Sequence, residues 1–277
     1  MKGLLFGAAT LALFFIACDP PGKVPVAPEP GGNVKLLFTD VTDTDSSVLS
    51  YDTSKQFTLF EQHDLSDGFT VFVKPVFENN KLTTALVGLS KSDITHQFKT
   101  FNYYMEGKLR SVYSYEYGFD KPARIDSLLY DASGSLTTSY VSVIASAGAQ
   151  IGLYQKNLFD WNGEGNIVKR FSIAMEGGKE TKDTTTTVYT YDNKVNYVTK
   201  QPDYGMMQLE EVADIFSANN ILTAVVSGPD TKREIKNVYY YDWDGYPVQV
   251  ITTEKEFYNG SVVDTRESGH KLTYVKK

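Results

Sequence analysis

The apolar side chains of this chain recur with the two-residue period of β-strands over most of its length. Residues 69–73, 113–117, 187–191 and 248–250 alternate apolar and polar positions or are rich in β-branched and aromatic side chains. Such segments are typical of strands, whose successive side chains point to opposite faces of a sheet. The pattern predicts an all-β protein.

Short turn signals separate these segments. Glycine or asparagine tolerates the positive φ of a tight hairpin turn, and an aliphatic residue shortly afterwards starts the return strand on its buried face. This combination occurs at Asn80-Lys81-Leu82, Gly107-Lys108-Leu109, Gly134-Ser135-Leu136, Gly165-Asn166-Ile167 and Gly260-Ser261-Val262. We expect a hairpin at each of these places.

A second motif, an aromatic residue followed by aspartate, precedes many turns. Its copies are Tyr51-Asp52, Phe119-Asp120, Tyr130-Asp131, Phe159-Asp160, Tyr191-Asp192 and Tyr241-Asp242. We expect each carboxylate to accept hydrogen bonds from the backbone N–H groups of the turn that it opens. The copies are irregularly spaced, unlike those of a strict solenoid or propeller. The sequence therefore predicts a long antiparallel meander of hairpins, curved into an open or partly closed barrel-like sheet.

One segment, residues 206–217, has helical periodicity. Its apolar residues recur at helical spacing, at Met206, Leu209, Val212, Ala213 and Phe216. This spacing predicts one short helix with an apolar face. We expect it to be a connector that packs over an open end or edge of the sheet.

The N-terminal segment has the features of an export signal. Lys2 precedes an apolar run, residues 4–17, which ends at Cys18, the only cysteine of the chain. We predict a signal peptide over residues 1–17. The alternative is a permanent transmembrane anchor, for which this run is short.

Residues 15–18, Phe-Ile-Ala-Cys, resemble the lipobox of bacterial lipoproteins. This resemblance implies cleavage before Cys18 and a lipid, including palmitate, on its sulfur. The protein would then be anchored by lipid in the bacterial cell envelope, most simply at the outer membrane, with the side of that membrane left open.

Five of the ten prolines follow the cysteine closely, at Pro20, Pro21, Pro25, Pro28 and Pro30. Proline-rich segments form extended, semi-rigid spacers. We therefore interpret residues 18–33 as a lipidated cysteine and proline-rich tether, and residues 34–277 as a single β-rich domain.

The formal net charge of −7 limits the partners of this chain. Phosphate backbones are bound by basic surfaces, so we expect no nucleic-acid partner. With its single cysteine acylated the chain can form no disulfide, so the domain must be stabilised by its own core.

Residue patterns for catalysis and metal binding are sparse. The histidines, His63, His96 and His270, are far apart, and no His-Glu-x-x-His pair or additional cysteine joins them as zinc ligands. The acidic clusters around Asp40, Asp43 and Asp45 and at Asp242 and Asp244 lack the spacing of a calcium-binding loop, so we interpret them as solvated turns. No Gly-x-Ser-x-Gly elbow is present. We predict no metal, no cofactor and no catalytic residue, and leave open a hydrolytic carboxylate pair, whose separation only a structure reveals.

The nineteen tyrosines are the most unusual feature of the composition. Residues two apart share one face of a strand, and tyrosines are so placed at 113, 115 and 117, at 189 and 191, and at 239 and 241. They could form a structural ladder of cross-strand aromatic pairs or a binding surface for sugars or peptides. For the second interpretation the candidate ligand-binding residues are Tyr239, Tyr241, Trp243 and Tyr246.

Two resemblances rest on these motifs. The aromatic-Asp-x-x-Gly-x-aliphatic unit is similar to the tyrosine-aspartate repeats of Rhs-type shell proteins. The order of the blocks 189–194, 216–221, 239–242 and 245–247 resembles a family of Gram-negative envelope lipoproteins of unknown function with a curved, porin-like β-sheet. The second resemblance implies a fold and no activity.

These features favour a non-enzymatic envelope lipoprotein that binds a glycan, a peptide or a protein partner through an aromatic-rich sheet surface. The alternatives are a purely structural or assembly component of the envelope and a hydrolase with an unrecognised carboxylate pair. A barrel that itself spans the membrane is less favoured, because charges interrupt the strands.

Overall fold

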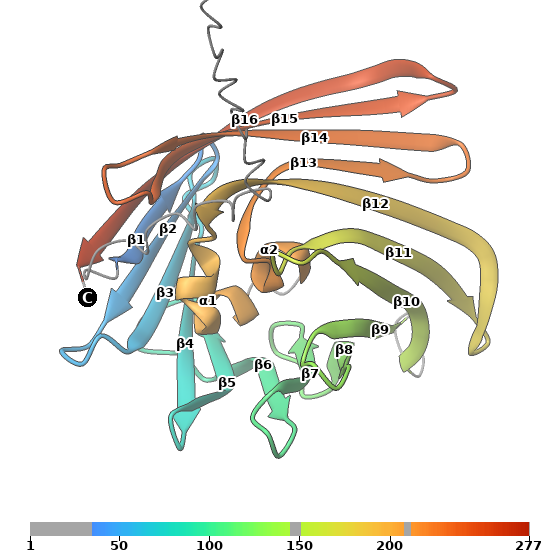
Figure 1. Ribbon diagram of the computed structural model, residues 1–277. Coiled ribbons are helices and arrows are strands. Elements are labelled where there is room, and N and C mark those ends of the chain that lie inside the picture. The colour runs from blue at the N-terminus through green and yellow to red at the C-terminus, as the bar shows by residue number, and fades with distance from the viewer. Residues whose placement is uncertain (1–34, 145–150, 208–211, 277) are drawn as a thin grey trace, which may run out of the picture.

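A single antiparallel sheet closes on itself in the computed structural model, which describes residues 35–144, 151–207 and 212–276 (Figure 1). Its strands are β1 (Lys35–Val41), β2 (Asp45–Tyr51), β3 (Phe57–Asp64), β4 (Thr70–Glu78), β5 (Lys81–Gly88), β6 (His96–Tyr103), β7 (Leu109–Tyr115), β8 (Pro122–Tyr130), β9 (Leu136–Ile144), β10 (Ile151–Trp161), β11 (Ile167–Glu176), β12 (Lys179–Val195), β13 (Asn219–Ser227), β14 (Thr231–Tyr241), β15 (Pro247–Tyr258) and β16 (Ser261–Lys276). Each strand pairs with its neighbours in sequence. The predicted all-β meander is confirmed.

The first and last strands close the barrel. β1 pairs with β16 from Lys35 opposite Lys276 to Val41 opposite Lys271. The sheet was expected to be open or partly closed, and closure is in fact complete. Closure removes the unpaired edges that would otherwise be available to another chain.

Because consecutive strands are antiparallel, the connections alternate between the two ends of the barrel. One end carries the turns 52–56, 79–80, 104–108, 131–135, 162–166 and 242–246 and the long connection from β12 to β13. We call this the plugged end, because that connection contains the helices described below. β1 begins at this end and β16 finishes there.

The turns that open at Asp52, Asp131 and Asp242 use the aspartate as expected, and the turn at Asn162 uses an amide in its place. Asp52 Oδ1 accepts hydrogen bonds from the backbone N–H groups of Ser54 and Gln56 at 2.8 and 2.9 Å. Equivalent bonds form at Asp131, Asn162 and Asp242. After Phe159-Asp160 the turn begins later than the motif suggests, since β10 continues to Trp161 and Asn162 takes the role of the aspartate.

The aliphatic residues that follow the turns are buried at the plugged end. Leu82, Leu109, Leu136 and Ile167 are at most 5% exposed. Val262 is 53% exposed, so the expectation that it starts a buried return strand is wrong. Its turn lies at the opposite end of the barrel, beyond the apolar core.

Aromatic residues at the plugged end connect neighbouring hairpins. Tyr103, Trp161 and Tyr191 donate hydrogen bonds of 2.5 to 2.8 Å to the carbonyl oxygens of Leu82, Leu136 and Ile167, the aliphatic residues of the preceding hairpins. Tyr51 and Tyr274 donate in the same way to Leu37 and Pro247. Burial raises the pKa of Tyr103 to about 12, which keeps its hydroxyl a donor at neutral pH. Aromatic side chains thus link neighbouring hairpins at the plugged end.

Three short helical segments connect β12 to β13 within the described residues: the 3₁₀-helix η1 (Val198–Lys200) and the α-helices α1 (Pro202–Met207) and α2 (Val212–Phe216). The sequence predicted one helix over 206–217. The observed α1 begins earlier, at Pro202, a residue suited to the first helical turn because it lacks an N–H group. Residues 208–211, in the middle of the predicted helix, lie outside the described residues. No helix in the described ranges is long and apolar enough to cross a membrane.

The helices lie within the plugged end of the barrel, against the inner face of its wall (Figure 1). Tyr204 of α1 packs against Phe57 and Phe60 of β3, with ring centroids 6.5 and 5.7 Å apart. Phe216 of α2 contacts the ring of Tyr130 on β8. A barrel of sixteen strands is too wide for wall side chains to fill. The helical connection supplies the missing apolar surface.

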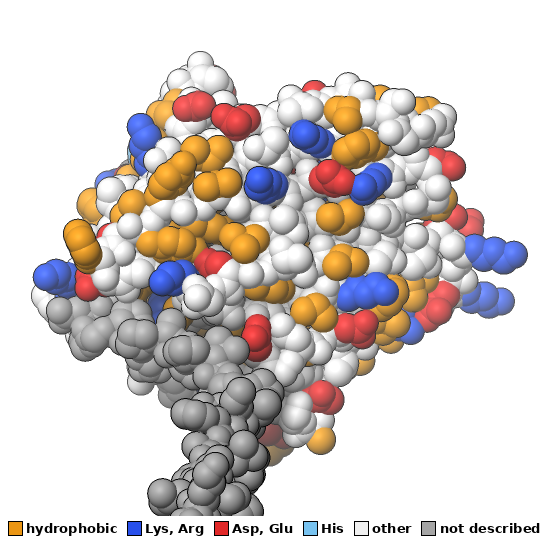
Figure 2. Space-filling model, turned by 45° about the horizontal axis from the view of Figure 1, so that its top comes forward, with side chains coloured by type: hydrophobic (Ala, Val, Ile, Leu, Met, Phe, Trp, Pro, Cys, Tyr) orange, Lys and Arg blue, Asp and Glu red, His pale blue; other side chains and the backbone are white. Residues whose placement is uncertain are grey.

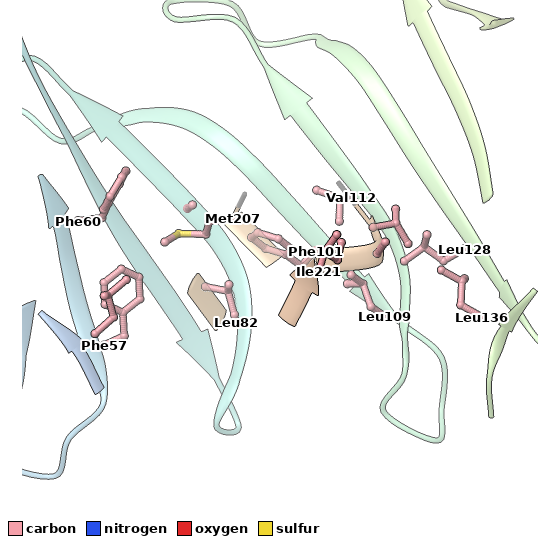
Figure 3. Close-up of a cluster of buried hydrophobic side chains, with 14 of the residues drawn as sticks. Phe57, Phe60, Leu82, Phe101, Leu109, Val112, Leu128, Leu136, Met207 and Ile221 are labelled. Atoms are coloured by element: carbon pink, nitrogen blue, oxygen red, sulfur yellow. The ribbon is translucent and has the colours of Figure 1, made fainter. Parts of the chain in front are cut away.

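The main hydrophobic core forms where the helices meet the wall. Its buried residues include Phe60, Leu82, Phe101 and Leu128 from the strands and Met207 from α1. Figure 3 shows these side chains along the inner face of the sheet, with Met207 among them. The core holds the helices against many strands at once.

Polar side chains line other parts of the inner face. Asn157 donates to Ser139 Oγ at 3.0 Å and accepts from Ser172 Oγ at 2.8 Å, so one chain of hydrogen bonds crosses β9, β10 and β11. Asn157 and Ser139 are 5% and 2% exposed. Buried polar groups of this kind are stable only when they are paired.

The turn between β14 and β15 allows a test of the hairpin assignment. Gly245 has a φ of +81°, and a Cβ added there would meet no other atom within 4 Å. Gly245→Val should therefore lower the free energy of unfolding by about 1–3 kcal/mol through backbone strain alone, measured by denaturant unfolding. Gly269→Val is the control, because Gly269 in β16 also has open space and no positive φ. Equal stability of the two variants would contradict the turn.

Candidate ligand-binding site

A cavity of about 430 Å³ lies between the helical connection and the inner face of the barrel wall. The wall is formed here by β13–β16 and β1, which the closure of the barrel brings together. The residues that line the cavity are Asp40, Asn196, Tyr197, Val198, Tyr204, Gly205, Asp214, Ile215, Asn220, Ile221, Ile235, Asn237, Tyr239, Val250, Thr252 and His270. Its size is within the range of small-molecule sites.

The seam between β1 and β16 contributes an acid–imidazole pair. Asp40 Oδ1 lies 2.9 Å from His270 Nδ1, and the two side chains are 18% and 37% exposed. The hydrogen bond to Asp40 raises the pKa of His270 above its usual value of 6.5, against the opposing effect of burial. The pair joins residues from the two ends of the chain.

Three tyrosines supply aromatic surface from three directions. Tyr197 precedes η1, Tyr204 belongs to α1 and Tyr239 belongs to β14. Burial raises the pKa of each hydroxyl well above 10. These rings therefore present neutral hydroxyl groups over the whole physiological pH range.

Three asparagines hold the walls of the cavity together. Asn196 Nδ2 donates to the backbone carbonyls of Asp214 and Ser217, and Asn196 Oδ1 accepts from the N–H group of Val198. Asn237 donates to the carbonyl of Ile221 and accepts from Thr252.

The third asparagine, Asn220 of β13, links this strand to β12 and β14. Asn220 Nδ2 lies within hydrogen-bonding distance of Asp192 Oδ2, the carbonyl of Val195 and the hydroxyl of Tyr241. The amide donors of the asparagines are thus occupied within the protein.

The four predicted ligand-binding residues lie in three different environments. Tyr239 lines the cavity, and Tyr241 stacks against it with ring centroids 5.9 Å apart and an interplanar angle of 21°. The hydroxyl group of Tyr241 donates a hydrogen bond to Asp192 Oδ2. Tyr246 is 5% exposed and accepts a hydrogen bond from the backbone N–H of Lys35, whereas Trp243 is 105% exposed at the turn. Only Tyr239 belongs to the cavity.

Other candidate residues from the sequence do not form a common site. His63 bonds Thr70 Oγ1, and His96 packs on the ring of Tyr117. Asp45 accepts from Thr44 in the β1–β2 turn, while Asp40 is in the cavity. Across residues 35–144, 151–207 and 212–276, no group of three His, Cys, Asp or Glu side chains is placed to hold a metal ion.

No local pattern in the sequence indicates the acid–imidazole pair of the cavity. Asp40 and His270 are 230 positions apart, and only the pairing of β1 with β16 makes them neighbours. Tyr197 and Tyr204 were missed as well, because they belong to no motif. Pro202 and Gly205, on either side of Tyr204, are a local sign of an irregular connection.

The sequence matches no protein-family model and no curated protein. The architecture, by contrast, has counterparts among solved structures. The fold resembles that of a porin-like protein. That porin-like protein, from Bacteroides uniformis, aligns with this chain with a TM-score of 0.51 and 10% sequence identity. The match covers 89% of this chain and 97% of the other.

A second porin-like protein, from Bacteroides vulgatus, aligns with a TM-score of 0.39 and 14% identity over 88% of this chain and 98% of its own. The porin-like character of the sheet, expected from the sequence, is confirmed as a matter of fold by the first comparison. The resemblance to lipoproteins and to Rhs-type repeats stays a prediction.

Proposed function

We propose that this protein is a non-enzymatic lipoprotein of the bacterial cell envelope that binds a small polar ligand, a glycan or a peptide fragment, inside its barrel. The observation that carries this proposal is the cavity between the helical connection and β13–β16. It combines three tyrosine rings with carboxylate, imidazole and hydroxyl groups. Sites of this kind use aromatic surface for affinity and a few polar groups for orientation.

The mixed charged and apolar surface of the outer face supports a barrel that lies in water beside the membrane. Ile235 and Asn237 of β14 line the cavity, so Lys236 between them and Glu234 before them point outward. Glu234 lies opposite Lys255 of β15. Figure 2, in which the β13–β16 side comes forward, shows basic, acidic and apolar side chains interspersed over this face. Membrane-spanning barrels have a continuous apolar band at such positions.

A lipid on Cys18 would account for membrane attachment of such a barrel. The proposed signal peptide (1–17) and tether (18–33) lie outside the described residues. The described chain begins at Lys35, whose Nζ forms ion pairs with Asp242 and Asp244 at the plugged end. The tether would therefore join the barrel at the end that the helices occupy.

The anchor is tested by Cys18→Ser in the full precursor. Because no other side chain of this chain can form the thioether to lipid, we expect the variant to lose palmitate labelling and signal processing. Labelling of cells with a palmitate analogue, followed by purification of the protein, measures this. Lipid incorporation equal to that of the wild type would overturn the lipoprotein assignment.

The binding proposal is tested on glycan and peptide arrays with the mature protein and two matched variants. Tyr239→Ala removes a ring that lines the cavity, whereas Tyr240→Ala removes the neighbouring ring, which is 50% exposed on the outer face. We expect a specific array signal that Tyr239→Ala abolishes and Tyr240→Ala retains, with both variants folded by thermal unfolding. A blank array for the wild type would contradict the proposal and favour a purely structural component of the envelope.

A further inference from the structure

The charges around the cavity are predominantly negative. Asp40 projects from β1 on one side, and Asp214 of α2 lies on another. His270 is the only basic side chain among the described residues that line it. An anionic ligand would lie beside the carboxylate of Asp40, whose ion-pair partner in the described part of the chain is His270.

The aromatic rings add to this preference. The faces of tyrosine rings carry negative electrostatic potential and attract cations, most strongly where water is excluded. Tyr197, Tyr204 and Tyr239 line the same cavity as the two carboxylates. The charges of Asp214 and Asp192 add to burial in raising the pKa of Tyr239, which places negative charge close to its hydroxyl.

The cavity offers carboxylate and hydroxyl oxygens that can accept hydrogen bonds from a ligand. The amide donors of Asn196, Asn220 and Asn237 bond within the protein. Asp40 engages His270 through Oδ1, which leaves Oδ2 for another partner. A ligand that brings several N–H donors can bond this carboxylate oxygen and the tyrosine hydroxyl oxygens at the same time.

We propose that the cavity recognises a small organic cation, an aliphatic primary amine whose ammonium group lies between Asp40 and the tyrosine rings. This inference rests on the proposed function, since it names the ligand class of the same cavity. An ammonium group supplies three donors and a positive charge, which the carboxylates and the rings both favour.

The imidazole of His270 makes recognition depend on pH. Asp40 from β1 bonds it, and the other titratable groups that line the same cavity are Tyr197 and Tyr204 from the helical connection, Asp214 from α2 and Tyr239 from the barrel wall. When His270 is protonated, its positive charge forms an ion pair with Asp40 and competes with the ammonium group of the ligand. Since the pKa of His270 is raised above 6.5, amine affinity should be greatest above that pKa and fall as the pH drops through it.

The test uses the mature wild-type protein and the matched probes 1,4-diaminobutane and 1,4-butanediol, with binding measured by calorimetry. The two probes have the same carbon chain and differ in charge at neutral pH. At pH 8.5 we expect the diamine to bind at least about tenfold more tightly than the diol. Between pH 8.5 and pH 5.5 its affinity should fall about tenfold as His270 gains its proton. Equal affinities for the two probes, or a pH-independent affinity, would overturn the amine assignment.

Two variants separate local recognition from the overall negative charge. Asp40→Asn removes the carboxylate in the cavity, and Asp160→Asn makes the same change at an exposed position of β10. We expect Asp40→Asn to lose diamine affinity about tenfold or more and Asp160→Asn to keep it. Equal losses in the two variants would mean that the charge of the whole protein attracts the probe.

The same measurements distinguish this inference from the proposed function. The protein could bind a neutral sugar or a peptide through Tyr239 and fail to bind the diamine. That result would overturn the amine assignment and leave the binding proposal intact. A protein that binds no array member, sugar or amine would overturn both.

Discussion

Phe101→Ala should lower the free energy of unfolding by about 3–5 kcal/mol, the usual cost of removing a large buried ring. Phe101 is on β6, is 3% exposed and belongs to the same cluster as Met207 and Ala213 of the helical connection. The size of the effect depends on the helices. If they did not fill the barrel, this ring would face water and its removal would cost much less.

Phe119→Ala is the matched control, because Phe119 lies in the β7–β8 turn and is 63% exposed. Surface substitutions usually change stability by no more than about 0.5 kcal/mol. Denaturant unfolding of both variants under the same conditions measures the difference. Equal losses would show that the helices do not pack against β6.

Gly88→Ala should be nearly as damaging, with a loss of about 3 kcal/mol at the upper end of what overpacking costs. A Cβ at Gly88, the last residue of β5, would stand 1.9 Å from the backbone oxygen of Asp93 and 2.8 Å from the Cα of Ile94. Both atoms belong to the backbone of the loop between β5 and β6. Because no flexible side chain can move aside, the loop itself must shift.

The control for this substitution is Gly152→Ala in β10, where an added Cβ meets nothing within 4 Å. We expect that change to be neutral or slightly stabilising, since alanine reduces the conformational freedom of the unfolded chain. A melting temperature of Gly88→Ala equal to that of Gly152→Ala would mean that the β5–β6 loop is packed differently.

The local parts of the fold could be predicted from the sequence because their causes are local. Gly107, Gly134 and Gly165 have positive φ in the observed turns, and strands follow the apolar alternation around them. Asp52 and Asp242 accept the turn hydrogen bonds that their motif predicts. These features depend only on residues a few positions apart.

The non-local parts could not be predicted. Nothing in the sequence near Lys35 or Lys276 shows that β1 and β16 pair, and barrel closure decides which side chains meet in the cavity. The helical period of residues 206–217 suggested an apolar face without revealing what it packs against. Tyr204 finds its partners, Phe57 and Phe60, across the interior of the barrel.

The placement of the helices explains how a porin-like wall can form a binding site. Barrels of sixteen strands are wide enough to leave an aqueous channel. In this protein η1, α1 and α2 occupy part of that space, and a cavity of about 430 Å³ remains between them and β13–β16. The wall and the connection are both needed to form the cavity, since the wall contributes Tyr239 and the connection contributes Tyr197 and Tyr204.

NMR of the mature protein with ¹³C-labelled tyrosine rings tests the claim that a ligand binds between the helical connection and the wall. The protein is titrated with a mixed set of oligosaccharides, peptides and amines, and the signals are assigned with single Tyr→Phe variants. We expect saturable shifts of the Tyr197, Tyr204 and Tyr239 signals and none at Tyr240 or Tyr258, which are exposed on the surface. Shifts confined to the exposed tyrosines, or no shift with any compound, would contradict the claim.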